Sequence, residues 1–446
     1  MDILRGILGI LSILGIAWLF STHKTKVSWR LVGSALLMQF VLATVLLKHE
    51  FLSSIWAPLG WPKEVFGFIS GFFVIVLEFT TEGALFLFGD LAKSPGVEGS
   101  LGSFFAFQVL PTIVFFASLT AILYHYNVLQ WVVKRISKLV QKALRTSGAE
   151  SLSVITNIFV GQTEAPLVVK PFLPSMTRSE LLAIMTGGMA TIAGGVMAAY
   201  VQMLGNSYAI TMDVSLQVGR LMFAEQLLSA SLMAAPAALL IAKIMIPETD
   251  EPVTYGDVSI DIPKSEANGI DAAASGAGTG LKLAANVGAM LLAFIALLAM
   301  FNYGLEWLST VTTLNQFLPG GQPLTIQMIL GWLFFPIAWL IGVPLQDCLQ
   351  FGSLIGTKLV LNEFVAYLDL SSLISANSLS PKTITMATFA LCGFANFSSI
   401  AIQIGGIGSL APNKKSEIAS LGLRAVLAGS LATLLTASIA GLYVGS

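Results

Sequence analysis

Long apolar stretches recur along the chain, separated by shorter polar segments. A transmembrane helix needs about 20 consecutive, predominantly apolar residues. Eight stretches approach or exceed that length, and the predicted spans are residues 3–20, 31–47, 104–124, 181–204, 227–246, 283–301, 384–407 and 421–444. The pattern therefore predicts an all-α polytopic membrane protein with about eight transmembrane helices.

The composition agrees with this interpretation. The chain is 55% hydrophobic and 11% charged, with a mean hydropathy of +0.83, whereas about a quarter of the residues are charged in a soluble globular domain. Its 23 basic and 24 acidic residues leave a net charge of −1, which gives no indication of a nucleic-acid partner. Cys348 and Cys392 are far apart and the three histidines are scattered, so the sequence predicts no disulfide framework and no zinc site.

Short basic segments indicate which connections face the cytoplasm, because Lys and Arg next to spans stay on that side. These segments are residues 21–30, 132–145 and 412–424. Eight spans with the N-terminus outside place all three in the cytoplasm, together with the long polar segment 247–280. The first span is interpreted as an uncleaved helix, since no small-residue cleavage site ends its apolar run.

Two segments are too polar to cross the bilayer as simple helices. Residues 150–173 contain GQTEAP at 161–166, and residues 345–368 contain Lys358 and Glu363. Non-helical backbone at membrane depth is tolerated only where protein covers it or where it lines a watery cavity. Each segment is therefore expected to form a re-entrant hairpin, in which two short helices meet at a polar tip.

The order of elements repeats once along the chain. A span, an amphipathic stretch, a hairpin and two further spans occur in residues 101–250 and again in residues 281–446, with the amphipathic stretches at 128–145 and 324–343. The first set starts outside and the second inside, so the two repeats are expected to be inverted, as in many secondary transporters.

The remaining regions flank the two repeats. Residues 1–100 are expected to form N-terminal scaffold helices, and residues 251–280 a cytoplasmic linker. Glu78 and Glu82 lie four residues apart in an apolar stretch, which favours the polar face of an amphipathic helix lying in the membrane interface.

Glu164 and Glu363, at the two hairpin tips, are the leading functional candidates. A charge at the bilayer centre costs about 3 kcal/mol or more, and such residues usually mark a substrate or ion pathway. The alternative is a structural ion pair with a buried lysine such as Lys170 or Lys358.

Two predicted spans are interrupted by small and polar residues at equivalent places in the repeats, at 185–196 and 391–402. Such interruptions are typical of helices that unwind at a binding site. Asn396 and Ser399 are equally consistent with hydrogen bonds between helices, and the glycines at 194–195 with close helix packing.

Four motifs in order resemble those of the concentrative nucleoside transporters, and the likeness extends from about residue 60 to the C-terminus. They are GQTEAP (161–166), NVGAMLLAF (286–294), GTKLVLNEFVAY (356–367) and CGFANFSS (392–399). The resemblance implies a homotrimer that imports nucleosides with a cation gradient by an elevator-like movement, without enzymatic chemistry. Each protomer would have a scaffold part and a mobile transport part that carries both hairpins.

The resemblance also implies roles for individual residues. Gln162, Thr163 and Glu164 would face the nucleobase, and Glu363, Asn396 and Ser399 would hold the ribose hydroxyls. Phe394 and Val196 would line the pocket. Gly161 and Gly195 leave backbone-only walls near the expected position of the base, so the pocket is expected to admit both pyrimidine and purine nucleosides, namely uridine, cytidine and adenosine-like nucleosides. These groups match a nucleoside, which offers an aromatic face, amide-like edges and two adjacent hydroxyls.

The family's sodium site, carried over in the same way, would comprise Asn157, Thr191, Ile192 and Val196. An all-oxygen, mostly neutral set suits a hard cation. The chain has no counterpart of three additional N-terminal helices found in longer animal relatives, which implies a bacterial inner-membrane form.

Three alternatives remain open at this stage. A proton-coupled nucleoside importer would use Glu164 or Glu363 as the proton carrier. A channel is disfavoured because opposed hairpins imply alternating access, and an intramembrane hydrolase because no His or Ser-Lys constellation is present.

Overall fold

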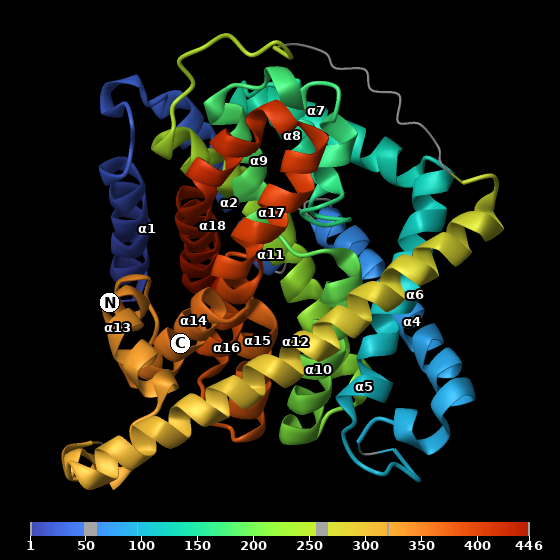
Figure 1. The fold of residues 1–446 in the computed structure, drawn as a ribbon, viewed down its shortest axis with the longest axis vertical. Coiled ribbons are helices and arrows are strands. Elements are labelled where there is room, and N and C mark those ends of the chain that lie inside the picture. Colours follow the sequence, from blue (N-terminus) through green and yellow to red (C-terminus); the bar gives the residue numbers. More distant parts are fainter. Residues whose placement is uncertain (1, 49–59, 96, 256–265, 319–320, 445–446) are drawn as a thin grey trace.

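A computed structural model of the chain describes residues 2–48, 60–95, 97–255, 266–318 and 321–444 (Figure 1). Helices and turns account for the described residues, with no strand among them. Seven of the helical runs are long and apolar enough to cross a membrane. The prediction of an all-α polytopic membrane protein is therefore confirmed.

The N-terminal region supplies three long helices, α1 (Asp2–Leu19), α2 (Trp29–Leu47) and α4 (Trp61–Phe88). The first two match the spans predicted at 3–20 and 31–47. Glu78 and Glu82 are both exposed on α4, as expected for a polar face. This helix is also long and apolar enough to cross a membrane, so its interfacial position stays a prediction.

The two repeats contain the predicted elements in the predicted order. The first comprises α5 (Phe105–Gln108), α6 (Leu110–His125), α7 (Val128–Leu144), α8 (Gly148–Thr156), the 3-10 turns η4 (Ala165–Val169) and η5 (Leu173–Ser175), α9 (Arg178–Ala190), α10 (Gly194–Met212) and α11 (Leu216–Met245). The second comprises α12 (Gly269–Val311), α13 (Ile326–Leu340), α14 (Cys348–Val360), α15 (Glu363–Ser375), α16 (Pro381–Leu391), α17 (Phe397–Leu410) and α18 (Lys415–Tyr443).

The two hairpins enter from opposite ends of the molecule. In Figure 1, α8 lies near the upper end and α14 and α15 lie near the lower end. The helix α9 descends from the upper end and continues as α10, whereas α16 rises from the lower end and continues as α17. Opposite positions of the two hairpins are expected for inverted repeats, and the inverted repeat with re-entrant hairpins stays a prediction.

Two elements differ from the sequence prediction in their form. The second arm of the first hairpin is a pair of 3-10 turns rather than an α-helix, because Pro166, Pro171 and Pro174 remove backbone donors and clash with the preceding turn. The helix α12 begins at Gly269, well before the span predicted at 283–301 and inside the predicted linker. Residues 256–265 of that linker lie outside the described residues.

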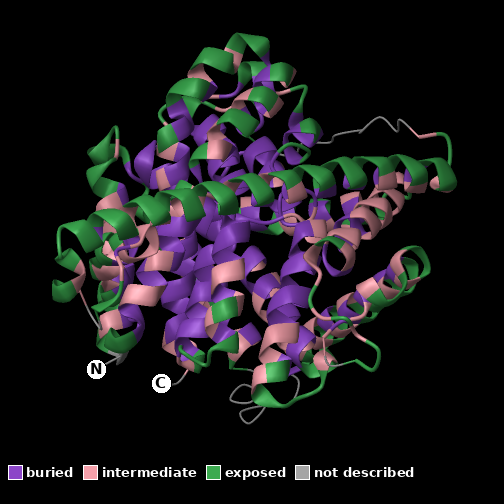
Figure 2. Ribbon diagram, turned by 60° about the horizontal axis from the view of Figure 1, so that its bottom comes forward, coloured by how far each residue is buried: buried purple, intermediate pink, exposed green. Residues whose placement is uncertain are grey.

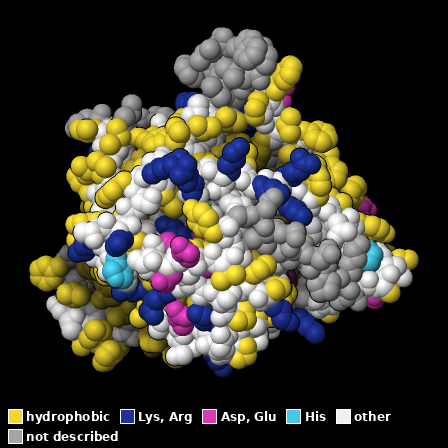
Figure 3. All heavy atoms as spheres, turned by 90° about the horizontal axis from the view of Figure 1, so that it is seen from above, with side chains coloured by type: hydrophobic (Ala, Val, Ile, Leu, Met, Phe, Trp, Pro, Cys, Tyr) yellow, Lys and Arg dark blue, Asp and Glu magenta, His cyan; other side chains and the backbone are white. Residues whose placement is uncertain are grey.

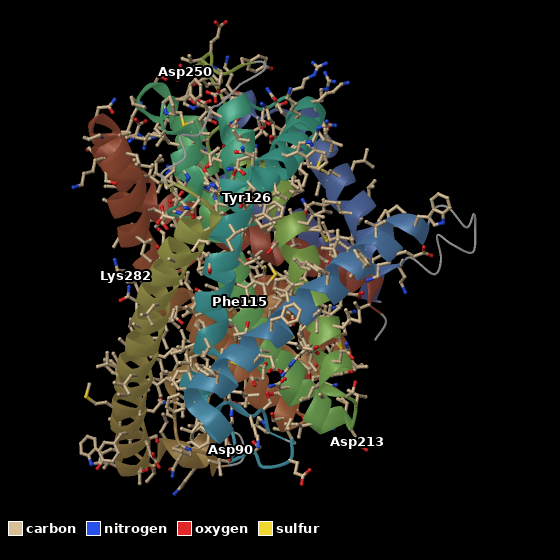
Figure 4. The ribbon with its side chains drawn as sticks, turned by 90° about the vertical axis from the view of Figure 1, so that its right-hand side faces the viewer. Asp90, Phe115, Tyr126, Asp213, Asp250 and Lys282 are labelled. Carbon is tan, nitrogen blue, oxygen red and sulfur yellow. The ribbon has the colours of Figure 1, made fainter. Side chains whose placement is uncertain are left out.

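Basic side chains are numerous at one end of the molecule. Figure 3 looks onto the upper end of Figure 1, where Lys and Arg side chains gather around the rim of the face. Figure 4 places Asp250, which follows α11, at this end, and Asp90 and Asp213 at the opposite end. Because acidic residues lie at both ends, only the Lys and Arg side chains bear on orientation, and a cytoplasmic upper end stays a prediction.

Polar bonds tie each hairpin to the adjoining broken helix at the outer end. In the first repeat the Ser147 hydroxyl, which caps α8, donates to the Glu180 carboxylate in the first turn of α9 (2.5 Å). In the second repeat the Asp347 carboxylate, at the start of α14, accepts from the Ser380 hydroxyl (2.6 Å) and the Thr383 hydroxyl (2.5 Å) at the start of α16. The same junction is thus built twice with different side chains.

The long helix α12 packs against α6 through small residues. A Cβ atom at Gly276 or Gly280 would lie 2.8 Å from backbone atoms of α6, so these two positions allow the helices to touch closely. Only 17% of the most apolar 18-residue segment of α12 is buried. Figure 2 shows its outward side exposed along most of its length, which leaves a long apolar face uncovered in the single chain.

The two broken helices cross where both are interrupted. Gly393 adopts φ +145°, and a Cβ atom there would lie 2.5 Å from the Met189 carbonyl oxygen near the end of α9. On the adjacent helix α18, a Cβ at Gly429 would lie 2.8 Å from the Met189 Cβ. The crossing therefore depends on glycine for both backbone conformation and space.

Replacing Gly393 by alanine should destabilise the protein by about 2–4 kcal/mol, through backbone strain and overpacking. The measurement is the thermal unfolding midpoint of the purified protein in detergent, which should fall by several degrees. Gly405→Ala is the matched control, because nothing lies within 4 Å of its Cβ position. Equal midpoints for the two variants would contradict the proposed crossing.

Candidate functional site

A polar network lies where the two hairpin tips meet the two broken helices. The interruption between α9 and α10 is extended, with Thr191 at φ −121° and ψ 165° and Ala193 at φ −69° and ψ 145°. The interruption between α16 and α17 ends at Asn396, whose side-chain oxygen accepts from the Ser399 backbone amide (2.9 Å) and caps α17. At the second break the Asn396 cap thus bonds a backbone amide that a continuous helix would bond internally, and at the first break the Gly194 amide donates to the Phe159 carbonyl (3.1 Å).

The tip of the second hairpin presents Glu363 as the first residue of α15. Asn362 caps this helix by accepting from the Val365 amide (2.9 Å). The Glu363 side chain is buried, and its two oxygens accept from the Tyr200 hydroxyl (3.1 Å) and the Asn396 side-chain amide (3.0 Å). A helix N-terminus favours a carboxylate, so backbone and side chains together stabilise the negative charge.

Lys358 does not form the ion pair that the sequence left open. Its Nζ donates to the Ala390 carbonyl at the end of α16 (2.9 Å) and to the Thr433 hydroxyl of α18 (3.2 Å). Within the described ranges, no ion pair joins a lysine or arginine to Glu363 at 4.0 Å or less. The lysine therefore satisfies the end of a broken helix, where a cation is favoured, and acts on Glu363 only from a longer distance.

The tip of the first hairpin joins the same network through Gln162. Its Nε2 donates to the Ser399 hydroxyl (3.3 Å), and its Oε1 accepts from Gln403 Nε2 (3.1 Å). Thr163 and Glu164, the next two residues, are exposed in the structure. Glu164 lies close enough to Tyr124 on α6 for the two to interact electrostatically.

The residues expected to hold sodium lie beside this tip. Asn157 is 1% exposed and ends α8; its Nδ2 donates to the Ser153 carbonyl (3.3 Å), while its Oδ1 is buried with no hydrogen-bond partner among the described residues. The single proton of the Thr191 hydroxyl is donated to the Gly187 carbonyl (2.9 Å), and the Asn157 carbonyl lies 3.3 Å from the same oxygen. The lone pairs of the Thr191 hydroxyl oxygen stay available to bind a cation. Ile192 lies between Thr191 and Ala193 in the segment that joins α9 to α10.

This donor set fits a sodium ion. A buried oxygen without a partner costs about 1–3 kcal/mol, and a cation bound at the Asn157 Oδ1 would remove that cost. The neutral amide, hydroxyl and carbonyl oxygens are ligands that hard cations prefer.

The predicted substrate residues are brought together to different degrees. Gln162, Glu363, Asn396 and Ser399 form one hydrogen-bonded chain that joins both tips. Val196 is buried in the first turn of α10, and Phe394 is half-buried at the opposite break. Both side chains are hydrocarbon, so they take no part in these hydrogen bonds. The roles of all these residues stay predictions.

Two members of the network were missed from the sequence, Tyr200 and Gln403. Tyr200 follows Val196 by four residues on α10, and Gln403 follows Ser399 by four residues on α17. Residues four apart share one face of a helix. A search for polar residues one helical turn after each predicted site residue would therefore have identified both.

Comparison with protein families gives three matches that together span most of the chain. A family described as "Na+ dependent nucleoside transporter N-terminus" matches residues 8–91, and its C-terminal counterpart matches residues 226–441. A family described as "Nucleoside recognition" matches residues 106–207.

Similar full-length proteins and solved structures agree with these matches. The nucleoside permease NupC of Helicobacter pylori is 41% identical over 99% of this chain and 98% of its own. The human sodium/nucleoside cotransporter 1 is 38% identical over 97% of this chain and 63% of its own. The structure of CNTnw in an inward-facing substrate-bound state is 44% identical, with a TM-score of 0.85 over 99% of this chain and 98% of that one. A variant of CNTnw in an outward-facing state also gives a TM-score of 0.85, at 42% identity over the same shares.

Proposed function

Because the chain belongs to the family of Na⁺-dependent nucleoside transporters, we propose that it imports nucleosides together with sodium by an elevator-type alternating-access mechanism. Members of the family are permeases and cotransporters rather than enzymes. The observation that carries the proposal is the hydrogen-bonded chain from Gln162 through Ser399 and Asn396 to Glu363. It gathers donors and acceptors from both hairpins at one place.

The chemistry of this chain suits a nucleoside. The Glu363 carboxylate can accept from two adjacent ribose hydroxyls, and such charge-assisted bonds are worth about 1.5–3 kcal/mol each. Asn396 and Ser399 would orient the sugar, while Phe394 and Val196 would border the pocket. Gln162, Thr163 and Glu164 would face the edge of the base.

Sodium would act through the tip of the first hairpin. Asn157 and Gln162 lie on the same tip, five residues apart, so an ion held by Asn157 Oδ1 and the extended segment after α9 would order the loop that carries Gln162. A nucleoside binding to the ordered tip would bind more tightly, and the coupling must be reciprocal.

The assembly and location are part of the same proposal. The uncovered apolar face of α12 and its close packing with α6 support a homotrimer in which these helices belong to the scaffold. The hairpins and broken helices, tied together at their outer ends, would form the moving part. The similarity to the nucleoside permease NupC of Helicobacter pylori supports the bacterial inner membrane.

The function is tested by uptake of labelled uridine into proteoliposomes with an imposed sodium or proton gradient. Inward sodium should drive accumulation, and a proton gradient without sodium should not. Accumulation driven by protons alone would replace sodium coupling with proton coupling through Glu164 or Glu363. No uptake of any nucleoside under either gradient would refute nucleoside transport itself.

Asn157→Ala should raise the sodium concentration for half-maximal uridine uptake about tenfold or more, since one ion–oxygen bond worth at least ~1.4 kcal/mol is lost. The measurement is uptake against sodium concentration at constant ionic strength. Ser151→Ala, which removes a buried hydroxyl of α8 that is already bonded to Thr146 and Ser147, should leave that concentration unchanged. An unaltered sodium dependence in Asn157→Ala would remove this residue from the ion site.

Glu363→Gln should weaken uridine binding about tenfold to a hundredfold, as expected for losing one charge-assisted bond. The glutamine would also turn an N–H toward either Tyr200 or Asn396, both of which donate to the carboxylate. Calorimetry with uridine, a deoxyribose analogue and uracil measures the effect, and the exposed Glu82→Gln serves as control. Normal uridine binding in Glu363→Gln, or equal affinity of the wild type for uracil and uridine, would end the ribose-clamp assignment.

A further inference from the structure

We propose that Gln403 is a positioning residue that fixes the orientation of the Gln162 carboxamide and thereby sets the preference between nucleosides whose bases have opposite donor and acceptor patterns. The inference rests on the proposed function, because Gln162 must face the base for its orientation to matter. It adds a residue on α17 to the determinants of selectivity.

The orientation follows from a backbone carbonyl, which can only accept a hydrogen bond. Gln403 Nε2 lies 2.9 Å from the Met185 carbonyl oxygen of α9, so the amino group of the Gln403 amide must point there. The same Nε2 lies 3.1 Å from Gln162 and donates its second proton to Oε1. Gln162 Nε2 is thereby directed to the Ser399 hydroxyl.

The far end of the chain is fixed independently by a backbone donor. The Ser399 amide can only donate, and it donates to Asn396 Oδ1 (2.9 Å), which directs Asn396 Nδ2 to Glu363 (3.0 Å). Each carboxamide in the network therefore has one permitted orientation. If the Gln403 amide were reversed, its oxygen would face the Met185 carbonyl oxygen and Gln162 Oε1, neither of which can donate a hydrogen bond.

Close packing also restricts the side-chain amides of Gln162 and Gln403 to these partners. Gln403 is 1% exposed and Gln162 is 8% exposed. Both pack against Gly188 of α9, where a Cβ atom would lie 2.9 Å from Gln162 Cβ and 2.9 Å from Gln403 Nε2. Gln403 Oε1 is buried with no hydrogen-bond partner in the described part of the chain. The glutamine thus holds its orientation through its two donated bonds and not through its carbonyl.

The fixed carboxamide has one N–H and one oxygen lone pair left over, at set positions. Uridine presents a carbonyl acceptor beside a ring N–H donor, whereas cytidine presents an amino donor beside a ring nitrogen acceptor. The two patterns are reversed, so a carboxamide that cannot rotate matches one of them better. A carboxamide that rotates freely would serve both alike.

Substitutions at residue 403 separate these cases. In Gln403→Glu the side chain carries at most one proton, which the Met185 carbonyl takes, so Gln162 must turn its own N–H toward residue 403 in either protonation state. The ratio of the KM values for uridine and cytidine should then change by about fivefold or more in the direction opposite to the wild-type preference, as for one hydrogen bond of ~1 kcal/mol. In Gln403→Met, which anchors nothing, the two KM values should approach each other.

The readouts distinguish a positioning role from a structural one. A structural role would lower the maximal uptake rate of both nucleosides alike, whereas a changed orientation of the Gln162 carboxamide should alter the ratio of their KM values. Gln39→Met, at a fully buried glutamine of α2, is the matched control and should keep the wild-type ratio. Should the glutamate variant fail to fold, the neutral methionine variant decides alone.

An unchanged uridine-to-cytidine ratio in the folded Gln403 variants would overturn the inference while leaving nucleoside transport intact. Equal KM values in the wild type would overturn it as well. Failure of the wild type to transport either nucleoside would instead refute the proposed function, so the two failures are distinguishable.

Discussion

The hydrogen bond from the Ser399 amide to the Asn396 side chain is the interaction on which the centre of the molecule depends. Unpaired backbone groups away from water cost several kcal/mol each, so a helix can stop inside an apolar protein only where other groups replace its internal bonds. Asn396 does this for α17 and at the same time donates to Glu363. One residue therefore both ends the interruption and holds the second hairpin against it.

The two interruptions are completed in different ways. At the second, the lysine ammonium of residue 358 is bonded to the last turn of α16, so a positive charge is built into the chain. At the first, the side-chain oxygen of Asn157 has no partner among the described residues, and no ammonium is bonded to it. The second repeat thus carries its own cation, the Lys358 ammonium, whereas the first repeat has a buried oxygen suited to a free cation.

The spans, the hairpins and the residues of the central network were accessible from the sequence to different extents. Gln162, Glu363, Asn396 and Ser399 stood out because polar groups in apolar segments are costly unless they are used. The bonds that join each hairpin to the broken helix were not accessible, since Asn396 and Glu363 are 33 positions apart and Gln162 and Ser399 are 237 positions apart. The roles assigned to them came from family resemblance and not from spacing.

Local sequence also misled where packing outweighs propensity. Residues 269–280 are rich in glycine and small polar residues, which favours a loop, yet they form the first three turns of α12 because those small residues pack against α6. In the first hairpin the opposite holds, since two short helices were expected and three prolines prevented the second.

The paired bonds at the outer ends of the hairpins have a mechanical consequence. Ser147 with Glu180, and Asp347 with Ser380 and Thr383, join each hairpin to its neighbour at the end farthest from the central network. The opposite end of the first hairpin turns at Gly161, with φ +154°. Each hairpin is therefore fixed to its neighbour at its outer end. Any rotation of a hairpin that keeps these bonds intact displaces its tip most and its outer end least, so an opening between the hairpins would form at the tips.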